Sequence, residues 1–419
     1  MLFGIRTMDE LEVRGATVLL RADVNQPVDR KTGRLKDTTR IRASIPTLAE
    51  LSKKGAKTVL LAHQGSDIEY KNFYTLRPHS EVIASLLDAK VKFVEDVCGP
   101  AALEAVKNLR DGEVLILENV RFLAEEQTLF ELNLKLDHER QAETLLVRKL
   151  APLADFYIGD AFAAAHRDQP SLCGFQQVLP SAMGRLFERE YAVVSQLTES
   201  PERPCVFVLG GSKIGDAFLM METVLAAKTA DLVLAGGLVG EILSWARGVD
   251  LGRTTREFII KEGHDRLLDK AKKLLADHPG SFLVPEDYAF ASDGKRAEAD
   301  VGQLPDDHLL ADIGSKTAGK FRQAIEGAKT VFVNGPVGIF EEAPSELGTK
   351  AVWEALAETG AHTVIGGGDS IAAAEKFRVT EKIGYVCTGG GALIRFLSGE
   401  VLPVVRALRH GSLIDEKRI

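Results

Sequence analysis

Short apolar runs rich in β-branched residues alternate along the chain with longer stretches whose apolar residues recur every three to four positions. The longer stretches, such as residues 41–54 and 79–87, have the spacing of amphipathic helices. In the first half, the short runs predict strands at ATVLLRADV (16–24), TVLLAHQ (58–64), KFVEDV (92–97), VLILENVRF (114–122) and FYIGDAF (156–162). This alternation predicts an α/β chain in which helices cover both faces of parallel sheets.

The second half repeats the pattern. Its apolar runs predict strands at VFVLGG (206–211), LVLAGG (232–237), FLVPEDYAF (282–290), TVFVNGP (330–336), TVIGGG (363–368) and YVCTGGG (385–391). Between the halves, SAMGRLFEREYAVVSQLTE (181–199) has the spacing of one amphipathic helix, with prolines on both sides.

These patterns predict two doubly wound, Rossmann-like parallel-sheet domains joined by a hinge helix. The N-terminal domain is expected over residues 1–180, the interdomain helix over 181–199 and the C-terminal domain over 200–400. The segment 401–419 is polar beyond Leu408, and either packs back on the first domain or frays.

The two halves differ at the ends of their strands, which is where ligands bind in open α/β sheets. The strand ends of the first half carry the polar side chains Asp23, Asn25, His63, Arg121, His166 and Arg167. The strand ends of the second half carry glycines at 210–211, 236–237, 335, 366–368 and 389–391. The first set suits a small anion, and the second presents bare backbone to a polyphosphate or a flat ring. One glycine doublet alone is typical of a tight turn, but five in equivalent places favour a ligand site.

The stretch TVIGGGDSIAAAEKF (363–377) places Asp369 at the start of an alanine-rich helix, directly after three glycines. Unpaired amides at a helix start attract anions. Asp369 therefore has two interpretations: it caps the helix, or it holds a metal that accompanies a bound anion.

The composition of the chain argues against several classes of binding partner. The chain has 419 residues, of which 45% are hydrophobic and 27% charged, with a net charge of −8. This acidic balance argues against nucleic acid or an anionic membrane as the main partner. The N-terminus has no apolar stretch of signal length, and no run approaches the roughly 18–20 apolar residues of a membrane span. We therefore expect a cytoplasmic protein.

Standard motifs exclude several classes of site. The four cysteines are far apart and lack CxxC spacing, so the sequence suggests neither a zinc site nor a disulfide framework. GSKTAGKF (314–321) nearly matches a P-loop, but Phe321 replaces the required Ser or Thr, and the preceding DHLLADI is a poor strand. The dinucleotide fingerprint GxGxxG is absent from the sequence, which leaves an NAD-dependent dehydrogenase as a weak alternative.

Nine blocks, in order and covering nearly the whole chain, resemble phosphoglycerate kinase, most closely its archaeal-type members. They are RADVNQPVD (21–29), TTRIRASIPTL (38–48), ENVRF (118–122), GDAFAAAHRDQPS (159–171), VLGGSKIGD (208–216), ADIGSKT (311–317), NGPVGIFE (334–341), GGGDSIAAAEKF (366–377) and TGGGALIRFLSGEVLPVV (388–405). The resemblance implies two domains that close about a hinge, with 3-phosphoglycerate on the first and nucleotide on the second. It also implies phosphoryl transfer between 1,3-bisphosphoglycerate and ADP, giving 3-phosphoglycerate and ATP.

On the first domain, the resemblance makes Arg40 the central catalytic arginine. Asp23 and Asn25 would bind the substrate hydroxyl and carboxylate. The distal phosphate would be held by His63, Gly65, Ser66, Arg121 and Arg167. Arg42, two residues beyond Arg40 on the same helix, is interpreted as a surface charge.

On the second domain, the resemblance assigns Lys213 to the nucleotide phosphates and Asp369 to the nucleotide-bound Mg²⁺. Gly391 and Gly368 would lie close to the transferring phosphoryl group. The remaining nucleotide-binding positions are Gly211, Gly236, Gly237, Gly314, Asn334, Pro336, Glu341, Gly366, Gly367 and Ser370. The partners are therefore small molecules, and the protein is expected to be a monomer or a homodimer.

Two departures concern the substrate and the nucleotide. Ser66 stands where many family members have an arginine, which implies weaker phosphate binding, compensation by Lys71 or Arg77, or a substrate without that phosphate. Ala217 stands where a second lysine is familiar. Two alternative functions follow: a related carboxylate kinase acting on another small acid, and a non-catalytic nucleotide-binding paralogue.

Overall fold

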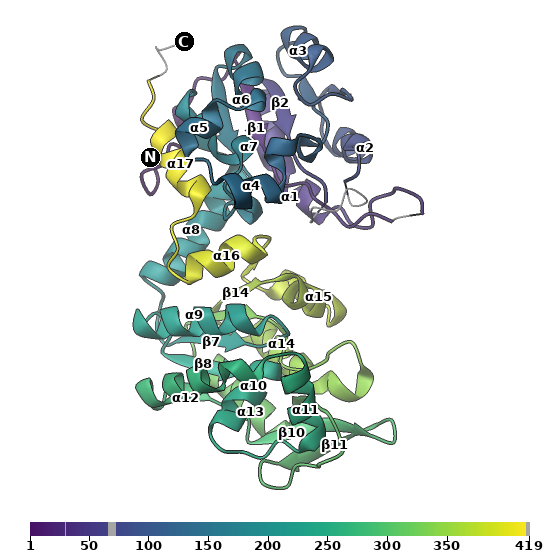
Figure 1. Ribbon diagram of the computed structural model, residues 1–419, viewed down its shortest axis with the longest axis vertical. Coiled ribbons are helices and arrows are strands. Elements are labelled where there is room, and N and C mark those ends of the chain that lie inside the picture. Colours follow the sequence, from purple (N-terminus) through teal and green to yellow (C-terminus); the bar gives the residue numbers. More distant parts are fainter. Residues whose placement is uncertain (30, 66–72, 416–419) are drawn as a thin grey trace. The chain divides into compact units, whose positions relative to one another are not determined.

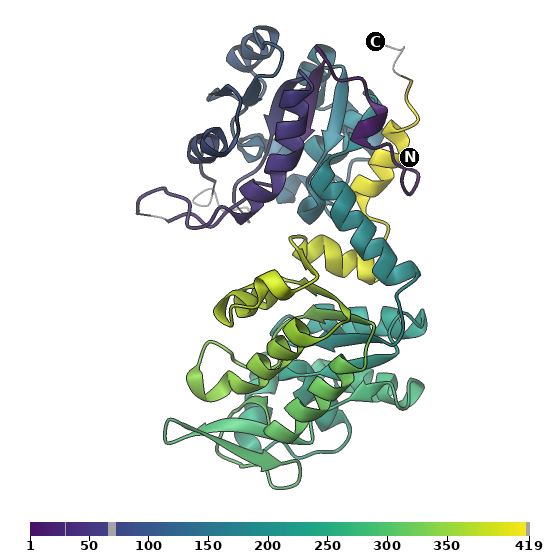
Figure 2. The same ribbon diagram turned by 180° about the vertical axis from the view of Figure 1, so that it is seen from behind.

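The computed structural model describes residues 1–29, 31–65 and 73–415, and it divides the chain into two compact units. The first unit contains residues 1–192 and 401–419, and the second contains residues 193–400. Each unit contains a six-stranded parallel sheet covered on both faces by helices, so the predicted fold class is confirmed (Figures 1 and 2).

The sheet of the first unit has the strand order β3-β4-β2-β1-β5-β6. Its strands are β1 (Thr17–Arg21), β2 (Lys57–Leu61), β3 (Val91–Phe93), β4 (Val114–Ile116), β5 (Phe156–Gly159) and β6 (Ser181–Met183). The helices of this unit are α1 (Thr39–Lys53), α2 (Arg77–Leu86), α3 (Pro100–Lys107), α4 (Thr128–Leu134), α5 (His138–Ala142), α6 (Leu145–Leu150) and α7 (Pro170–Cys173).

Burial explains why these segments form strands and helices. The central strands are almost completely buried, as expected for parallel strands covered on both faces. On one face, Val18 and Leu20 of β1 belong to the same core cluster as Ile41, Leu48 and Leu51 of α1. The three helical residues recur at the spacing of one helix face, so the amphipathic pattern of the sequence places α1 against the sheet.

The main sheet of the second unit has the order β15-β14-β13-β7-β8-β9. Its strands are β7 (Cys205–Leu209), β8 (Leu232–Ala235), β9 (Phe282–Leu283), β13 (Thr330–Asn334), β14 (His362–Gly366) and β15 (Tyr385–Cys387). Its helices are α9 (Ile214–Ala226), α10 (Gly237–Ala246), α11 (Arg253–Lys261), α12 (Leu268–Asp277), α13 (Ser315–Glu326), α14 (Leu347–Glu358), α15 (Gly368–Lys376) and α16 (Gly390–Leu397). Figure 1 shows α9, α10 and α12 on one face of this sheet, and the reverse view in Figure 2 shows α13 and α14 on the other.

A small antiparallel sheet corrects two sequence-based expectations. The segment 282–290 is not one strand: β9 ends at Leu283, and β10 (Asp287–Ser292) pairs with β11 (Lys295–Asp300) and β12 (Leu310–Ile313). The segment before GSKTAGKF, interpreted as a poor strand, is β12. Its buried Asp312 accepts a hydrogen bond from Arg296 Nη1 at 2.8 Å, so a partner on β11 makes the acidic residue compatible with a buried strand. Phe321 is itself buried in α13, which is consistent with the absence of a P-loop there.

The expected interdomain helix is shorter than the segment 181–199. Residues 181–183 form the edge strand β6, and α8 (Arg185–Glu199) begins after Gly184. A Cβ atom at Gly184 would lie 2.3 Å from Asp160 Oδ1. The Asp160 side chain, directly after β5, accepts hydrogen bonds from the backbone amides of Leu186 and Phe187 at 2.9 and 3.1 Å. This side chain therefore pairs with free amides in the first turn of α8. α8 starts in the first unit and ends in the second.

The C-terminal segment packs on the first unit through α17 (Pro403–Gly411). α17 contacts α7 and β6. Just beyond its end, Ser412 Oγ accepts the Arg6 amide at 2.8 Å, and within the helix Leu408 packs over Gly159. Of the two alternatives for residues 401–419, packing on the first unit therefore holds over 403–412.

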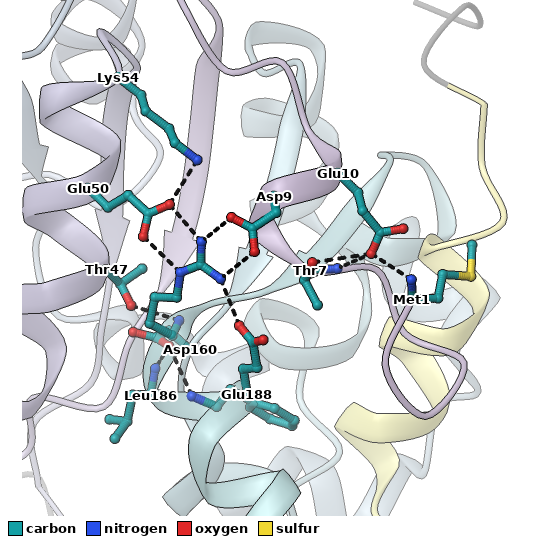
Figure 3. Close-up of polar contacts among 12 residues, drawn as sticks. Met1, Thr7, Asp9, Glu10, Thr47, Glu50, Lys54, Asp160, Leu186 and Glu188 are labelled. Carbon is teal, nitrogen blue, oxygen red and sulfur yellow. Dashed lines mark hydrogen bonds and ion pairs between the residues drawn. The ribbon is translucent and has the colours of Figure 1, made fainter.

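Arg185 fastens the start of α8 to the first unit. Figure 3 labels its partners Asp9, Thr47, Glu50 and Glu188. The Arg185 guanidinium donates to Glu50 Oε2 at 2.7 Å, to Asp9 Oδ1 at 2.5 Å and to Glu188 Oε2 at 2.9 Å. Its backbone amide donates to Thr47 Oγ1 at 3.0 Å. The hydrogen bond from Arg185, helped by Lys54, lowers the pKa of Glu50 to about 2.

We expect Arg185→Gln to lower the free energy of unfolding by about 1–2 kcal/mol at pH 7, because these pairs are partly exposed to screening solvent. The pKa of Glu50 is below its ordinary value of 4.5 in the folded protein, so its contribution is fully present above that pH and is lost as the pH falls toward 2. Urea unfolding followed by circular dichroism should therefore show a smaller difference from wild type at pH 3 than at pH 7.

Arg189→Gln is the matched control, because Arg189 is exposed on the same helix. A difference for Arg185→Gln that stays constant between pH 7 and pH 3 would contradict the role given to Glu50.

Candidate active site

The first unit gathers polar side chains at the carboxyl edge of its sheet. Asp23 and Asn25 follow β1, and His63 and Gly65 follow β2. Asp23 Oδ2 accepts Arg40 Nη1 at 2.9 Å, from the first turn of α1, and Asn25 Oδ1 accepts the Gly65 amide at 3.0 Å. The structure thus brings together five of the residues predicted for the substrate.

Neutral amide groups cross-link the loops that carry this cluster. Gln64 Nε2 donates to the Gln26 carbonyl at 2.8 Å, and Gln64 Oε1 accepts the Gln26 amide at 3.0 Å. Asn119 Nδ2 donates to the Gln64 carbonyl at 2.9 Å, and His79 Nε2 lies 2.8 Å from Gln64 Oε1. Burial lowers the pKa of His79 to about 4, so this imidazole is neutral. These amide contacts add no negative charge to the site.

Arg21, the last residue of β1, belongs to the cluster although the sequence reasoning gave it no site role. It is 1% exposed, and its Nη2 lies 3.1 Å from His63 Nδ1. An arginine only donates, so Nδ1 accepts and the proton of the neutral ring is on Nε2. Burial lowers the pKa of His63 well below its ordinary value; Asp23 partly opposes this, and Arg21, Arg121 and Arg40 add to it. In the sequence, the signal that could have pointed to Arg21 is a charged residue at the end of an otherwise apolar strand.

Arg121 lies in a short 3₁₀ turn, Val120–Phe122, that begins with the Asn119 side chain accepting the Arg121 amide at 3.0 Å. Its guanidinium donates to the Gly65 carbonyl, and its buried Nε has no hydrogen-bond partner among the residues that the structure describes. Burial, followed by repulsion from Arg167 and Arg21, lowers the pKa of Arg121 to about 10. A bound anion would relieve this repulsion.

Burial alone would raise the pKa of Asp23, but Arg40, the hydrogen bond from the Asn25 amide and Arg21 outweigh it and keep this pKa below its usual range. Asp23 is thus ionised at neutral pH. Together with the cations, it gives the site an acceptor suited to a hydroxyl group beside donors suited to phosphate or carboxylate oxygens.

The structure describes only some of the residues that were considered for the distal phosphate. Ser66 and Lys71 lie outside the described residues. Arg77, a suggested replacement for the missing arginine, pairs with Glu95 at 2.5 Å and stacks over the Phe93 ring at 4.9 Å. Arg167 Nη1 lies 3.8 Å from Glu131 Oε2. The additional buried cation in the cluster is Arg21 rather than Arg77.

In the second unit, glycines allow the loops after β7, β8 and β13 to pack backbone against backbone. A Cβ atom at Gly210 would lie 2.2 Å from the Pro336 carbonyl oxygen, and one at Gly236 would lie 2.4 Å from the Val337 side chain. The Gly211 amide donates to the Pro336 carbonyl at 2.7 Å, and the Gly237 amide to the Val337 carbonyl at 2.8 Å. Close packing therefore explains these glycines without a ligand, and their predicted contacts with nucleotide stay predictions.

Four helices begin at the carboxyl edge of this sheet: α9, α10, α15 and α16. No side chain caps any of them, since their N-cap residues are Lys213, Gly236, Gly367 and Gly389. Uncapped helix starts carry unpaired amides and partial positive charge, which suits phosphate groups. Lys213 is exposed beside this edge, and so are Gly368 and Gly391.

The capping interpretation of Asp369 is wrong. The N-cap of α15 is Gly367, at φ +89°, and Asp369 is an exposed residue of the first turn. Ser370 is buried, and its Oγ accepts the Gly335 amide at 2.8 Å. A Cβ atom at Gly367 would lie 2.7 Å from Asn334 Oδ1, so these segments pack closely. The Asp369 carboxylate is left facing solvent next to the uncapped amides.

Three other predicted positions of the second unit differ in how exposed they are to a ligand. Gly314 packs against Asp287, whose carboxylate accepts the Lys316 and Thr317 amides at 2.9 and 2.8 Å and so occupies the start of α13. Glu341 is exposed, and Gly366 is buried against Leu393. Ala217, the second departure, is completely buried on the inner side of α9.

We expect Gly335→Ala to destabilise the second unit by at least about 2 kcal/mol, because the position has φ +89° and its Cβ would lie 2.3 Å from the Gly210 carbonyl oxygen. Trp245 and Trp353, the two tryptophans of the chain, both lie in this unit, so fluorescence reports its thermal unfolding. Gly360→Ala is the control, since a Cβ there meets nothing within 4 Å. Equal melting of both variants would contradict the packing role.

The family profile of phosphoglycerate kinase matches residues 8–400. The phosphoglycerate kinase of Methanothermobacter thermautotrophicus is 45% identical over 408 residues, covering 97% of each chain. That of Thermococcus kodakarensis is 43% identical over 400 residues, covering 94% of this chain and 95% of the relative.

Among solved structures, the phosphoglycerate kinase of Pyrococcus horikoshii OT3 matches with a TM-score of 0.88 at 38% identity, covering 97% of this chain and 99% of the other. The archaeal relatives confirm the resemblance read from the nine sequence blocks. The chain belongs to the phosphoglycerate kinase family.

Proposed function

We propose that the protein catalyses reversible phosphoryl transfer between 1,3-bisphosphoglycerate and ADP, giving 3-phosphoglycerate and ATP. The observation that carries this proposal is the cluster of Arg21, Arg40 and Arg121 with neutral His63 around ionised Asp23 in the first unit. Such a cluster fits a small acid that carries both a hydroxyl group and a phosphate.

In the ATP-consuming direction, the attacking group is the substrate carboxylate, which is already ionised at pH 7 because its reference pKa is about 4. No general base is needed, so the protein contributes positioning and charge neutralisation. Arg40 supplies a planar fork whose Nη1 is oriented by Asp23. Asp23 and Asn25 orient the substrate hydroxyl and carboxylate, and His63, Gly65, Arg121 and Arg167 hold the distal phosphate.

The second unit fits the nucleotide. The uncapped starts of α9, α15 and α16 supply amides for the phosphates, and exposed Lys213 supplies a cation. Mg²⁺ prefers carboxylate and phosphate oxygens and keeps several waters. Exposed Asp369 beside the phosphate-binding amides fits that preference and would hold the ion. Bound with the nucleotide, Mg²⁺ neutralises charge on the phosphates.

The assignment of Gly236, Gly237, Gly314, Asn334, Pro336 and Glu341 to the nucleoside remains part of the proposal. The whole-length match to phosphoglycerate kinases favours this function over a kinase for another acid or a silent paralogue. Within the described residues, no helix combines the length and apolarity needed to cross a membrane. We propose a cytoplasmic location and a monomer or homodimer.

The proposal predicts ATP- and Mg²⁺-dependent turnover of 3-phosphoglycerate. Coupling the reaction to reductive removal of the acyl phosphate reports turnover as loss of NADH. Robust turnover would support the function and make Ser66 a tolerated variation. ATP binding without turnover would contradict it, and a screen of other small carboxylic acids would then separate the two alternatives.

In the same assay, we expect Arg40→Ala to lower kcat by about 10³-fold or more, because an arginine on the transferring phosphoryl group typically contributes that much. Nucleotide affinity should stay nearly unchanged, since Arg40 lies in the first unit. Arg42→Ala is the matched control: Arg42 is exposed on the same helix and donates to Thr38 Oγ1 at 3.1 Å. Near-normal turnover of Arg40→Ala would remove Arg40 from its role.

Because acid and nucleotide bind to different units, transfer requires the two units to approach each other and exclude water. Small-angle scattering should therefore show compaction when 3-phosphoglycerate and Mg²⁺–ATP are both present, and less with either alone. An unchanged scattering profile with both ligands would contradict a hinge-bending mechanism.

A further inference from the structure

Three side chains of types that can ligate a metal, from two segments of the chain, meet in the first unit. His138 begins α5, Asp168 precedes α7, and Cys173 ends α7. The two helices pack against each other, as Figure 1 shows. The ligand atoms of the three residues all lie within 4.8 Å of one another, and His138 Nε2 is 3.2 Å from Asp168 Oδ1. Because the ligands come from separate segments, no CxxC spacing marks them in the sequence.

The spacing and chemistry of the group suit zinc. Around tetrahedral Zn²⁺, bond lengths of about 2.0–2.3 Å place neighbouring ligand atoms roughly 3.3–3.8 Å apart. A set within 4.8 Å thus needs only small side-chain adjustments. One imidazole nitrogen, one thiolate and one carboxylate form a donor set that favours zinc over Mg²⁺ or Ca²⁺, which prefer oxygen alone.

We propose that His138, Asp168 and Cys173 form a binding site for a divalent transition metal of the zinc class, separate from the nucleotide-associated Mg²⁺. The Cys173 thiol releases its proton to solvent as the Cys173–metal bond forms, His138 binds through Nε2, and Asp168 through a carboxylate oxygen. A water molecule completes the four positions.

The surrounding charges favour a dication. Asp168 contributes one carboxylate to the group, and the carboxylate of Glu131 lies nearby, accepting the Asp168 amide at 2.8 Å. Arg406 on α17 is the opposing positive charge near Asp168. One thiolate and one carboxylate balance the two positive charges of the bound ion, so a site completed by a neutral imidazole and a water molecule carries no net charge.

The site adjoins a residue of the proposed substrate cluster. Cys173 Sγ lies 3.7 Å from the Arg167 carbonyl oxygen, and Asp168 follows Arg167 in the chain. The Asp168 amide donates to Glu131 Oε1 at 2.8 Å, while Arg167 Nη1 lies 3.8 Å from Glu131 Oε2.

Titration of the nucleotide-free protein with Co²⁺ tests the site directly, because a cobalt–thiolate bond gives near-ultraviolet charge-transfer absorption. We expect one equivalent to bind with this band. Cys173→Ser should abolish the band, and both Cys173→Ser and His138→Gln should lose at least about 100-fold in affinity, more than typical changes outside the metal ligands. Cys98→Ser, which alters another buried cysteine of the same unit, should bind as wild type does.

Absence of the thiolate band in wild type, or its persistence in Cys173→Ser, would overturn the site. Should a variant fail to fold, anomalous diffraction from wild-type crystals soaked in Zn²⁺ decides the matter. A peak among the three side chains supports the proposal, and a peak elsewhere or none overturns it. Neither measurement involves turnover, so failure here is distinguishable from failure of the proposed function.

Discussion

The first unit depends on buried positive charge that the protein does not neutralise fully. Arg21 and Arg121 are almost completely buried beside His63, and repulsion within the group, together with burial, lowers the pKa of Arg121. Nearby Glu126 is a weak counter-charge, because burial raises its pKa to about 7. The loops are fastened by neutral amides such as Gln64 and Asn119, which satisfy buried backbone groups without cancelling the potential. The folded protein thus keeps a positive electrostatic potential at this site, which favours binding of an anionic substrate.

In the second unit, backbone amides rather than cationic side chains are available to an anion. The sheet edge of this unit presents backbone amides at four uncapped helix starts, and close loop packing through Gly210, Gly236 and Gly335 keeps side chains out of the way. Amides in fixed positions interact with phosphate oxygens without the conformational entropy that long cationic side chains lose on binding. This division suits the two ligands: a small acid needs distinct groups for each substituent, whereas a polyphosphate presents repeated oxygens.

Much of this was predictable from the sequence, and the failures have physical reasons. The central strands are continuous apolar runs and were found, but β6 is three residues long and ends because Gly184 must pass Asp160, a contact invisible in the local pattern. Likewise, DHLLADI was interpreted as a poor strand, but β12 forms there and its buried Asp312 pairs with Arg296 on β11. Sequence blocks located Asp23, Arg40 and Arg121, yet the role of Arg21 depends on its distance from His63. Asp369 was misjudged as a possible cap because the turn at Gly367 starts the helix two residues earlier.

The two crossings of the chain between the units constrain how phosphoryl transfer is organised. One crossing lies within α8 and the other follows Glu400. On the first-unit side, both are fastened: α8 by Arg185 and by the Asp160 carboxylate, and the C-terminal segment by the hydrogen bond between Arg6 and Ser412. In the closure that we propose, rotation would therefore be absorbed beyond these anchors rather than inside the first unit. The cation cluster around Asp23 would then keep its geometry, as the positioning role proposed for Arg40 requires.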